Sequence, residues 1–231
     1  MIKEFNRNQL VNDYTLNIFS DASTKGSGIC DVCYGAIVVH KENIIDRLYR
    51  INSKSTVNEG EIKGIRTAIE FALKYRYLFP NINIFSDSQL SVFGIRDRIF
   101  NWTYHNIANH IYNTTGPLKN ESIYLEILDM IVSNGLYVNI YHQKGHVNQT
   151  SSNDVGVATD VFAASNNIRI KIGYDYIRYI STYNNIVDRE SRKILLRSEP
   201  RNIVTPIIYE PVDFYSKIET YKQIKQGGEQ Q

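Results

Sequence analysis

The sequence predicts an α/β fold in which a mixed five-stranded sheet is flanked by helices. Three β-prone segments joined by short turns come first and predict three antiparallel strands. An amphipathic segment and a fourth apolar segment follow, and the order strand, helix, strand favours parallel pairing. The fourth strand also repeats the first, because both contain Ile-Phe-Ser and both end on an aspartate, Asp21 or Asp87.

The composition is typical of a folded protein, and its nearly balanced charge does not indicate a particular binding partner. A chain of 231 residues suggests one domain, or one domain with an insertion, and 42% hydrophobic residues can bury a full core. The net charge of +2 means that any nucleic-acid-binding surface has to be local. No apolar stretch approaches roughly 18 residues and no signal-peptide core is present, so we expect a soluble cytoplasmic protein without a membrane partner. We also expect a monomer.

The cysteines and asparagines do not indicate a metal or catalytic site of their own. Cys30 and Cys33 form one C-x-x-C motif without a second cysteine pair or a nearby histidine pair, so the sequence favours reduced thiols over a zinc site. Asparagine is abundant, and we attribute this to background composition rather than to chemistry.

The first elements follow from alternation along the chain. Residues 1–13 are expected to be a polar lead-in. The first strand is expected at 14–20, where apolar residues alternate with polar and aromatic ones, and a turn follows Asp21. The second and third strands are expected at 33–40 and 44–51, with a short polar turn between them.

Helical spacing then replaces alternation. Apolar residues fall on one face from Thr56 to about Tyr77, which predicts an amphipathic helix that ends before Pro80. The fourth strand is expected at 83–86, and a second helix at 88–99.

The rest of the domain is less regular. A helix is expected at 122–132 and a fifth strand at 136–142, and the segment 147–183 is treated as an insertion. A last helix is expected at 184–197, which completes a single domain over 14–197. We expect 198–231 to be a partly disordered C-terminal extension.

Four acidic residues lie where such a fold can gather them. Asp21 and Asp87 end two strands, Glu61 lies near the start of the first helix, and Asp188 near the start of the last. Three or four carboxylates can hold two Mg²⁺ ions about 4 Å apart, a pair that activates water and stabilises the leaving oxygen of a phosphodiester. Each acid also has a structural alternative, as a turn residue or a favourable charge at a helix start, and Glu59 competes with Glu61.

At several places the sequence resembles the ribonuclease H family, in particular its ribonuclease HI-like members. The resemblance covers about residues 14–197. The matching segments are Ile18–Ser23, Thr56–Ile62, Ile84–Ser88, Pro117–Asn120, Lys144–His146, and Asn184–Asp188 with Ser191-Arg192. It implies that Asp21, Glu61, Asp87 and Asp188 are catalytic metal ligands, and that His146 assists proton movement or product release.

The resemblance also implies a substrate and cofactors. It implies an endonuclease that cleaves the RNA strand of RNA–DNA hybrids with two Mg²⁺ ions, or Mn²⁺ as substitute, and leaves 5′-phosphate and 3′-hydroxyl ends. Substrate contacts are implied for Ser23, Asn58, Ser88, Asn120 and Lys144. Further candidates for contacts with the nucleic acid are Gln89, Trp102, Tyr104, His105, Lys119 and Arg192.

Three alternatives stay open at this stage. In the family the last acid follows the Lys-Gly-His loop closely, so Asp160 or Asp154 competes with Asp188 for the fourth position. Another nuclease of the same fold, an exonuclease or a resolvase, is possible, although the Asp-x-Glu of the exonucleases is missing after Asp21. A non-catalytic module that binds nucleic acid or a protein through the insertion or the tail is the third.

Overall fold

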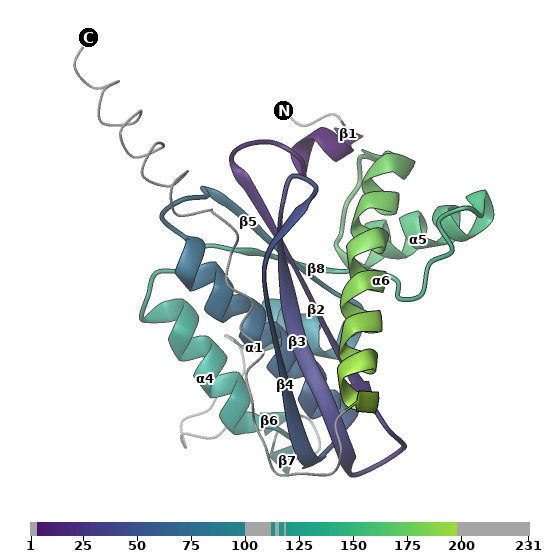
Figure 1. Cartoon of the computed structure of the whole chain (residues 1–231). Coiled ribbons are helices and arrows are strands. Elements are labelled where there is room, and N and C mark those ends of the chain that lie inside the picture. The colour runs from purple at the N-terminus through teal and green to yellow at the C-terminus, as the bar shows by residue number, and fades with distance from the viewer. Residues whose placement is uncertain (1–3, 100–111, 114–115, 118, 198–231) are drawn as a thin grey trace.

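The computed structural model describes residues 4–99, 112–113, 116–117 and 119–197 of the chain, and its centre is a five-stranded sheet (Figure 1). The strands lie in the order β4-β3-β2-β5-β8. Their bounds are β2 (Thr15–Thr24), β3 (Cys30–His40), β4 (Asn43–Ser55), β5 (Asn81–Ser86) and β8 (Asn139–His142). β2, β3 and β4 pair antiparallel, whereas β2 with β5 and β5 with β8 pair parallel. The predicted mixed sheet is therefore confirmed.

Helices cover both faces of this sheet. They are α1 (Val57–Tyr75), α2 (Gln89–Phe93) with its π-helical continuation η2 (Gly94–Arg98), α4 (Glu121–Val132), α5 (Ser152–Ser165) and α6 (Tyr174–Arg197). α1 and α4 lie on one face, and α6 crosses the other (Figure 1). α1 begins where the Thr56 side chain accepts a hydrogen bond from the Glu59 amide, which satisfies one of the free donors of the first turn.

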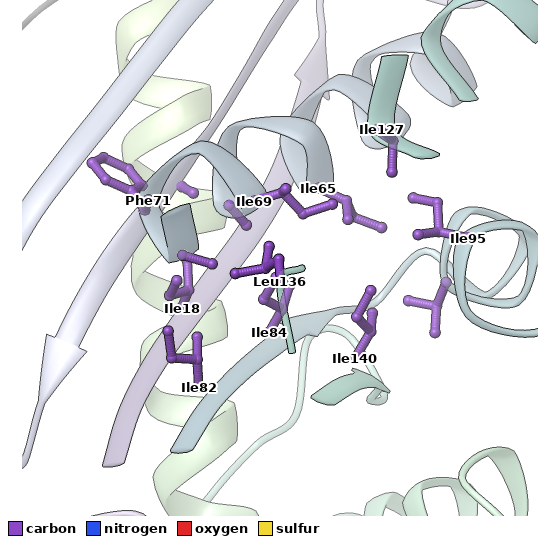
Figure 2. Close-up of a cluster of buried hydrophobic side chains, with 14 of the residues drawn as sticks. Ile18, Ile65, Ile69, Phe71, Ile82, Ile84, Ile95, Ile127, Leu136 and Ile140 are labelled. Carbon is purple, nitrogen blue, oxygen red and sulfur yellow. The ribbon is translucent and has the colours of Figure 1, made fainter. Parts of the chain in front are cut away.

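The two faces of the sheet bury different side chains. Figure 2 shows the first core, in which Ile18 and Ile84 of the sheet meet Ile65 and Ile69 of α1. The second core, under α5 and α6, is aromatic and contains Phe19, Phe85, Phe162, Tyr176, Tyr179 and Tyr183. Because both faces are covered, β2 is buried along almost its whole length, including its polar residues.

The parallel strands share an Asn-Ile-aromatic triplet that is aligned in register. Asn17 pairs with Asn83 and Asn83 with Asn139, and the isoleucines and aromatic residues that follow are paired in the same way. Asn83 Nδ2 donates to Asn17 Oδ1 (3.0 Å), and Asn139 Nδ2 donates to Asn83 Oδ1 (3.1 Å). Asn17 Nδ2 donates in turn to the Leu10 carbonyl (2.8 Å). The result is a row of amides that crosses three strands.

Aromatic rings form a second row beside the amides. Phe19 and Phe85 stack with centroids 5.0 Å apart, and Phe85 and Tyr141 with centroids 5.4 Å apart. A shift of one residue in either strand pair would separate both rows, so together they fix the register.

The structure differs from the expected elements near both ends of the domain. Within the lead-in, β1 (Glu4–Phe5) pairs parallel with β9 (Lys171–Ile172), and Leu10 is only 1% exposed because it packs into the aromatic core. The last helix begins at Tyr174 and not at residue 184, because the aromatic residues before 184 have helical spacing and face the sheet.

The segment 147–183 is more regular than expected. Much of it is helical, in α5 and in the first turns of α6. Short strands β6 (Tyr112–Asn113) and β7 (Gly116–Pro117) pair antiparallel. Trp102, Tyr104, His105 and the extension 198–231 lie outside the described residues. None of the described helices combines the length and the hydropathy that a membrane crossing requires.

The amide row gives a prediction about stability. We expect Asn83→Ala to lower the free energy of unfolding by about 1–3 kcal/mol, because it leaves the buried Asn17 Oδ1 and the Asn139 amide without partners. Urea unfolding at constant m-value measures the change. Asn153→Ala, at an exposed position in the first turn of α5, is the control and should stay within about 0.5 kcal/mol of wild type. Equal effects of the two substitutions would contradict the role of the row.

Candidate active site

Strand register positions the first two acids. Asp21 lies four residues after Asn17, and Asp87 lies four residues after Asn83, so the parallel pairing of these asparagines carries both carboxyl groups to the same edge of the sheet. Asp21 is still within β2, whereas Asp87 immediately follows β5. Ligands collect at this edge in α/β sheets because the chain leaves the sheet there.

Close packing of α1 brings the third acid to them. Glu61 is the fifth residue of α1, between Gly60 and Gly64. A Cβ atom at residue 60 would lie 2.4 Å from Val32 Cγ1, and one at residue 64 would lie 3.3 Å from the Asp21 carbonyl oxygen. Two glycines therefore allow the helix to approach the strands at this point. Ligand oxygens of Asp21, Glu61 and Asp87 all lie within 4.8 Å of one another.

The electrostatics of this cluster are unfavourable without a cation. Asp21 is 4% exposed, and burial raises its pKa well above 3.8, with further increases from the charges of Asp87 and Asp188. Burial and the charges of Asp21 and Asp87 likewise raise the pKa of Glu61. Burial also raises the pKa of Asp87, against a hydrogen bond from Asn184 (3.3 Å) and the nearby His146.

The donor atoms of the cluster suit a hard divalent ion. Asp21 Oδ2 and Glu61 Oε2 are buried and have no hydrogen-bond partner within the described part of the chain. Buried acceptors without partners are costly, and oxygen-only donor sets are those that Mg²⁺ and Mn²⁺ prefer. The three residues therefore fit such an ion.

Asp188 reaches the cluster from the opposite side. The charge of Asp188 and the interaction of its side chain with that of Asp21 both raise the pKa of Asp21, so the two carboxyl groups are neighbours. Asp188 accepts a hydrogen bond from Arg192 (2.7 Å). The expectation that Asp188 opens the last helix was wrong, since it lies in the second half of α6.

The two competing acids lie apart from this group. Asp154 accepts a hydrogen bond from the Asn148 amide (2.6 Å) and pairs with Lys144 (3.4 Å). Asp160 is exposed on α5. The group of carboxylates whose ligand oxygens lie within 4.8 Å of one another contains neither of them, nor Asp188. Of these three, only Asp188 has a charge that contributes to the raised pKa values of Asp21, Glu61 and Asp87.

The loop after β8 brings His146 to the edge of the cluster. His146 Nδ1 lies 3.6 Å from Asp188 Oδ2, and the histidine side chain is 69% exposed. Its φ of 52° is in the left-handed region, which turns the loop back toward the acids. A Cβ at Gly145 would lie 2.4 Å from Asp87 Oδ2, so only glycine fits there without moving the carboxylate.

The predicted substrate contacts have different environments. Ser23 is buried and hydrogen-bonded through its Oγ to Ser191 Oγ (2.7 Å), which links β2 to α6. Ser88 donates to Ser91 Oγ (2.8 Å), and Lys144 is paired with Asp154. Two asparagines are half-buried at helix starts: Asn58 in the first turn of α1 and Asn120, with φ 63°, directly before α4.

Asn184 was not among the predicted site residues, although its side chain is buried and donates to Asp87. Its spacing of four residues from Asp188 places both residues on one face of α6. That spacing is the observation from which the contact with the site could have been predicted.

Comparison with known proteins identifies the family. The family model described as RNase H matches residues 13–166, about two thirds of the chain. The chain belongs to the RNase H family. This confirms the resemblance found in the sequence and indicates a nuclease of the RNase H kind that binds nucleic acid. The match ends before α6 and so does not include Asp188. No curated protein matches the sequence.

Several solved RNase H structures are similar in fold. The RNase H domain of PFV has 17% identity and a TM-score of 0.49, over 70% of this chain and 98% of that domain. LC11-RNase H1, solved in complex with an RNA/DNA hybrid, has 12% identity and a TM-score of 0.44, over 65% of this chain and 98% of that one. The foamy viral protease–reverse transcriptase has 17% identity and a TM-score of 0.48, and the match spans 67% of this chain but only 20% of that much longer protein. The family assignment therefore depends on the sequence match.

The raised pKa values predict how stability depends on pH. Because Asp21 and Glu61 have a higher pKa in the folded state than in the unfolded chain, the folded state binds these protons more tightly. Without divalent ions, stability should therefore fall as the pH rises from the unfolded pKa values, near 4, through the raised folded ones. Asp21→Asn should weaken this dependence and raise the melting temperature at neutral pH, because it relieves repulsion.

Thermal unfolding in a chelator and in Mg²⁺ measures this effect. Mg²⁺ should raise the melting temperature of the wild type and have little effect on Asp21→Asn. Asp160→Asn, which removes an exposed acid of α5, is the matched control and should follow the wild type in both buffers. A control that shifts as much as Asp21→Asn would contradict the assignment of the pH dependence to the cluster.

Proposed function

We propose that this protein is a divalent-metal-dependent endonuclease that hydrolyses the RNA strand of RNA–DNA hybrids and leaves 5′-phosphate and 3′-hydroxyl ends. The observation that carries the proposal is the convergence of Asp21, Glu61 and Asp87, whose ligand oxygens lie within 4.8 Å of one another. Two of these carboxylates have a buried oxygen without a hydrogen-bond partner within the described residues, which supports metal binding.

Asp21, Glu61, Asp87 and Asp188 would hold two Mg²⁺ ions, or Mn²⁺ as substitute. Ions bound there supply an activated water and stabilise the leaving oxygen of a phosphodiester. The fourth position is assigned to Asp188 because its carboxyl group is close enough to raise the pKa of Asp21, whereas Asp154 is engaged with Asn148 and Lys144.

Three neighbouring side chains contact these acids and orient their carboxylates or lie ready to carry protons. Asn184 donates to Asp87 Oδ2 and so helps to orient that carboxylate. Arg192 holds Asp188 from the solvent side, at 2.7 Å. His146 is exposed and lies beside Asp188, so it can exchange protons with solvent while it remains next to the acids. We assign it to proton movement or product release.

Hybrid recognition requires polar groups that contact 2′-hydroxyls across the minor groove. Asn58 and Asn120 suit this role best among the predicted contacts, because no hydrogen bond of their side chains to another described residue competes for the amides. Ser23 suits it less, since its hydroxyl is buried and bonded to Ser191. Ser88, Gln89 and Lys144 remain candidates for contacts with the nucleic-acid backbone.

Substitution of the acids tests the proposal. Asp87→Asn should lower the rate of Mg²⁺-dependent hybrid cleavage by about a thousandfold or more while the fold is retained, because the amide removes a charged metal ligand. Asp188→Asn should do the same, and Asp160→Asn is the control that should cleave like the wild type. Cleavage of labelled hybrid, duplex RNA and duplex DNA, beside circular dichroism, measures these outcomes. Undiminished cleavage by Asp87→Asn would reject the assignment, and cleavage of DNA alone would favour another nuclease.

A milder change is expected at the histidine. His146→Ala should slow hybrid turnover by roughly 100-fold or less, because it removes a proton carrier and leaves the carboxylates in place. Mg²⁺ binding, measured by calorimetry, should stay at the wild-type level. Loss of Mg²⁺ binding in this variant would show that His146 supports the cation site itself.

A further inference from the structure

The second half of α6 exposes a row of cations. Arg189, Arg192, Lys193 and Arg197 are all exposed and recur at helical spacing. The row is about 12 Å long at 1.5 Å per residue. An open surface hollow adjoins it, whose described lining residues are Asp188, Arg189, Arg192, Lys193, Leu196 and Arg197.

The acids of this half of α6 neutralise only one cation of the row. Glu190 faces the sheet, where it pairs with Arg47 (2.7 Å) and accepts a hydrogen bond from Tyr49 (2.9 Å). Asp188 pairs with Arg192. Among the described residues no ion pair is formed by Arg189, Lys193 or Arg197. Three positive charges therefore face outward.

The helix dipole explains only part of the row. Cations in the last turn of a helix are stabilised by the partial negative charge of its free carbonyls, which accounts for Arg197 and contributes at Lys193. Arg189 lies about two turns from the end of α6, outside the range of that effect. It directly follows Asp188, so the row begins at the acidic cluster and runs away from it.

We propose that Arg189, Lys193 and Arg197 bind the phosphate backbone of the nucleic acid whose scissile phosphate lies at the acidic cluster. The proposal rests on the proposed function, which requires a polyanion at Asp188. A row of about 12 Å spans three to four phosphates at about 3.4 Å of helix axis each. Such contacts position a strand without reading its sequence.

A matched pair of double variants tests this proposal on the full chain. Arg189→Gln/Lys193→Gln removes two charges from the row. Arg169→Gln/Lys171→Gln removes two exposed charges in and just before β9, next to the N-terminal end of α6, where Lys171 pairs with Glu4 at 3.0 Å. Fluorescence anisotropy in EDTA follows the binding of a labelled RNA–DNA hybrid over a salt series, so no cleavage interferes. Circular dichroism and thermal unfolding establish that both variants fold.

The first double variant should bind the hybrid about tenfold more weakly and reduce the slope of log K against log salt by about 2. The control should keep the wild-type affinity and slope. In Mg²⁺, the first variant should raise KM for hybrid cleavage and keep kcat, because neither residue belongs to the carboxylate cluster. An equal loss of affinity in both variants, or none in the first, would overturn the proposal.

These outcomes separate the two proposals. A wild type that binds hybrid without cleaving it refutes the proposed function, and the comparison of affinities still decides the role of the cation row. A wild type that cleaves hybrid while the first double variant binds normally refutes the row alone. A wild type that binds neither hybrid, duplex DNA nor single-stranded RNA overturns the role of the row directly.

Discussion

The register of the parallel strands is the constraint on which the site depends. The side chains of Asn17, Asn83 and Asn139 are buried or half-buried on the aromatic face of the sheet, and each needs its neighbour because a lost hydrogen bond inside the protein is costly. The single row of aromatic rings beside them, Phe19, Phe85 and Tyr141, imposes the same alignment of the strands. Asp21 and Asp87, each four residues beyond its asparagine, become neighbours as a result. The proximity of two like charges is thus maintained by contacts that carry no charge.

The ionised acidic cluster destabilises the fold locally, and the packing around it offsets this cost. Burial and mutual repulsion raise the pKa of Asp21, Glu61 and Asp87, so their ionised forms oppose folding at neutral pH. Close packing at Gly60 and Gly64 nevertheless holds α1 against the strands. From the other side, the Ser23–Ser191 hydrogen bond ties α6 to β2. Packing from both sides therefore holds the three carboxylates together, which is the arrangement that a preorganised cation site requires.

Much of this could be predicted from the sequence. Alternation and helical spacing gave the mixed sheet and α1, and the repeated Ile-Phe-Ser-Asp indicated that Asp21 and Asp87 lie together. The aromatic segment before residue 184 was treated as irregular, because tyrosines occur in strands, helices and loops alike, although the buried residues Tyr176, Tyr179 and Tyr183 have the spacing of one helical face. The asparagines were attributed to composition, because hydrogen bonds between strands become visible only once the register is known.

The long helix α6 has a consequence for how this protein tolerates changes in length. Its first turns are fixed by the packing of Tyr176 and Ile177, and Asp188 follows about three turns later. One residue added between them would rotate Asp188 by about 100° and aim it away from Asp21. The number of residues from Tyr176 to Asp188 therefore has to be kept if Asp188 is to face Asp21.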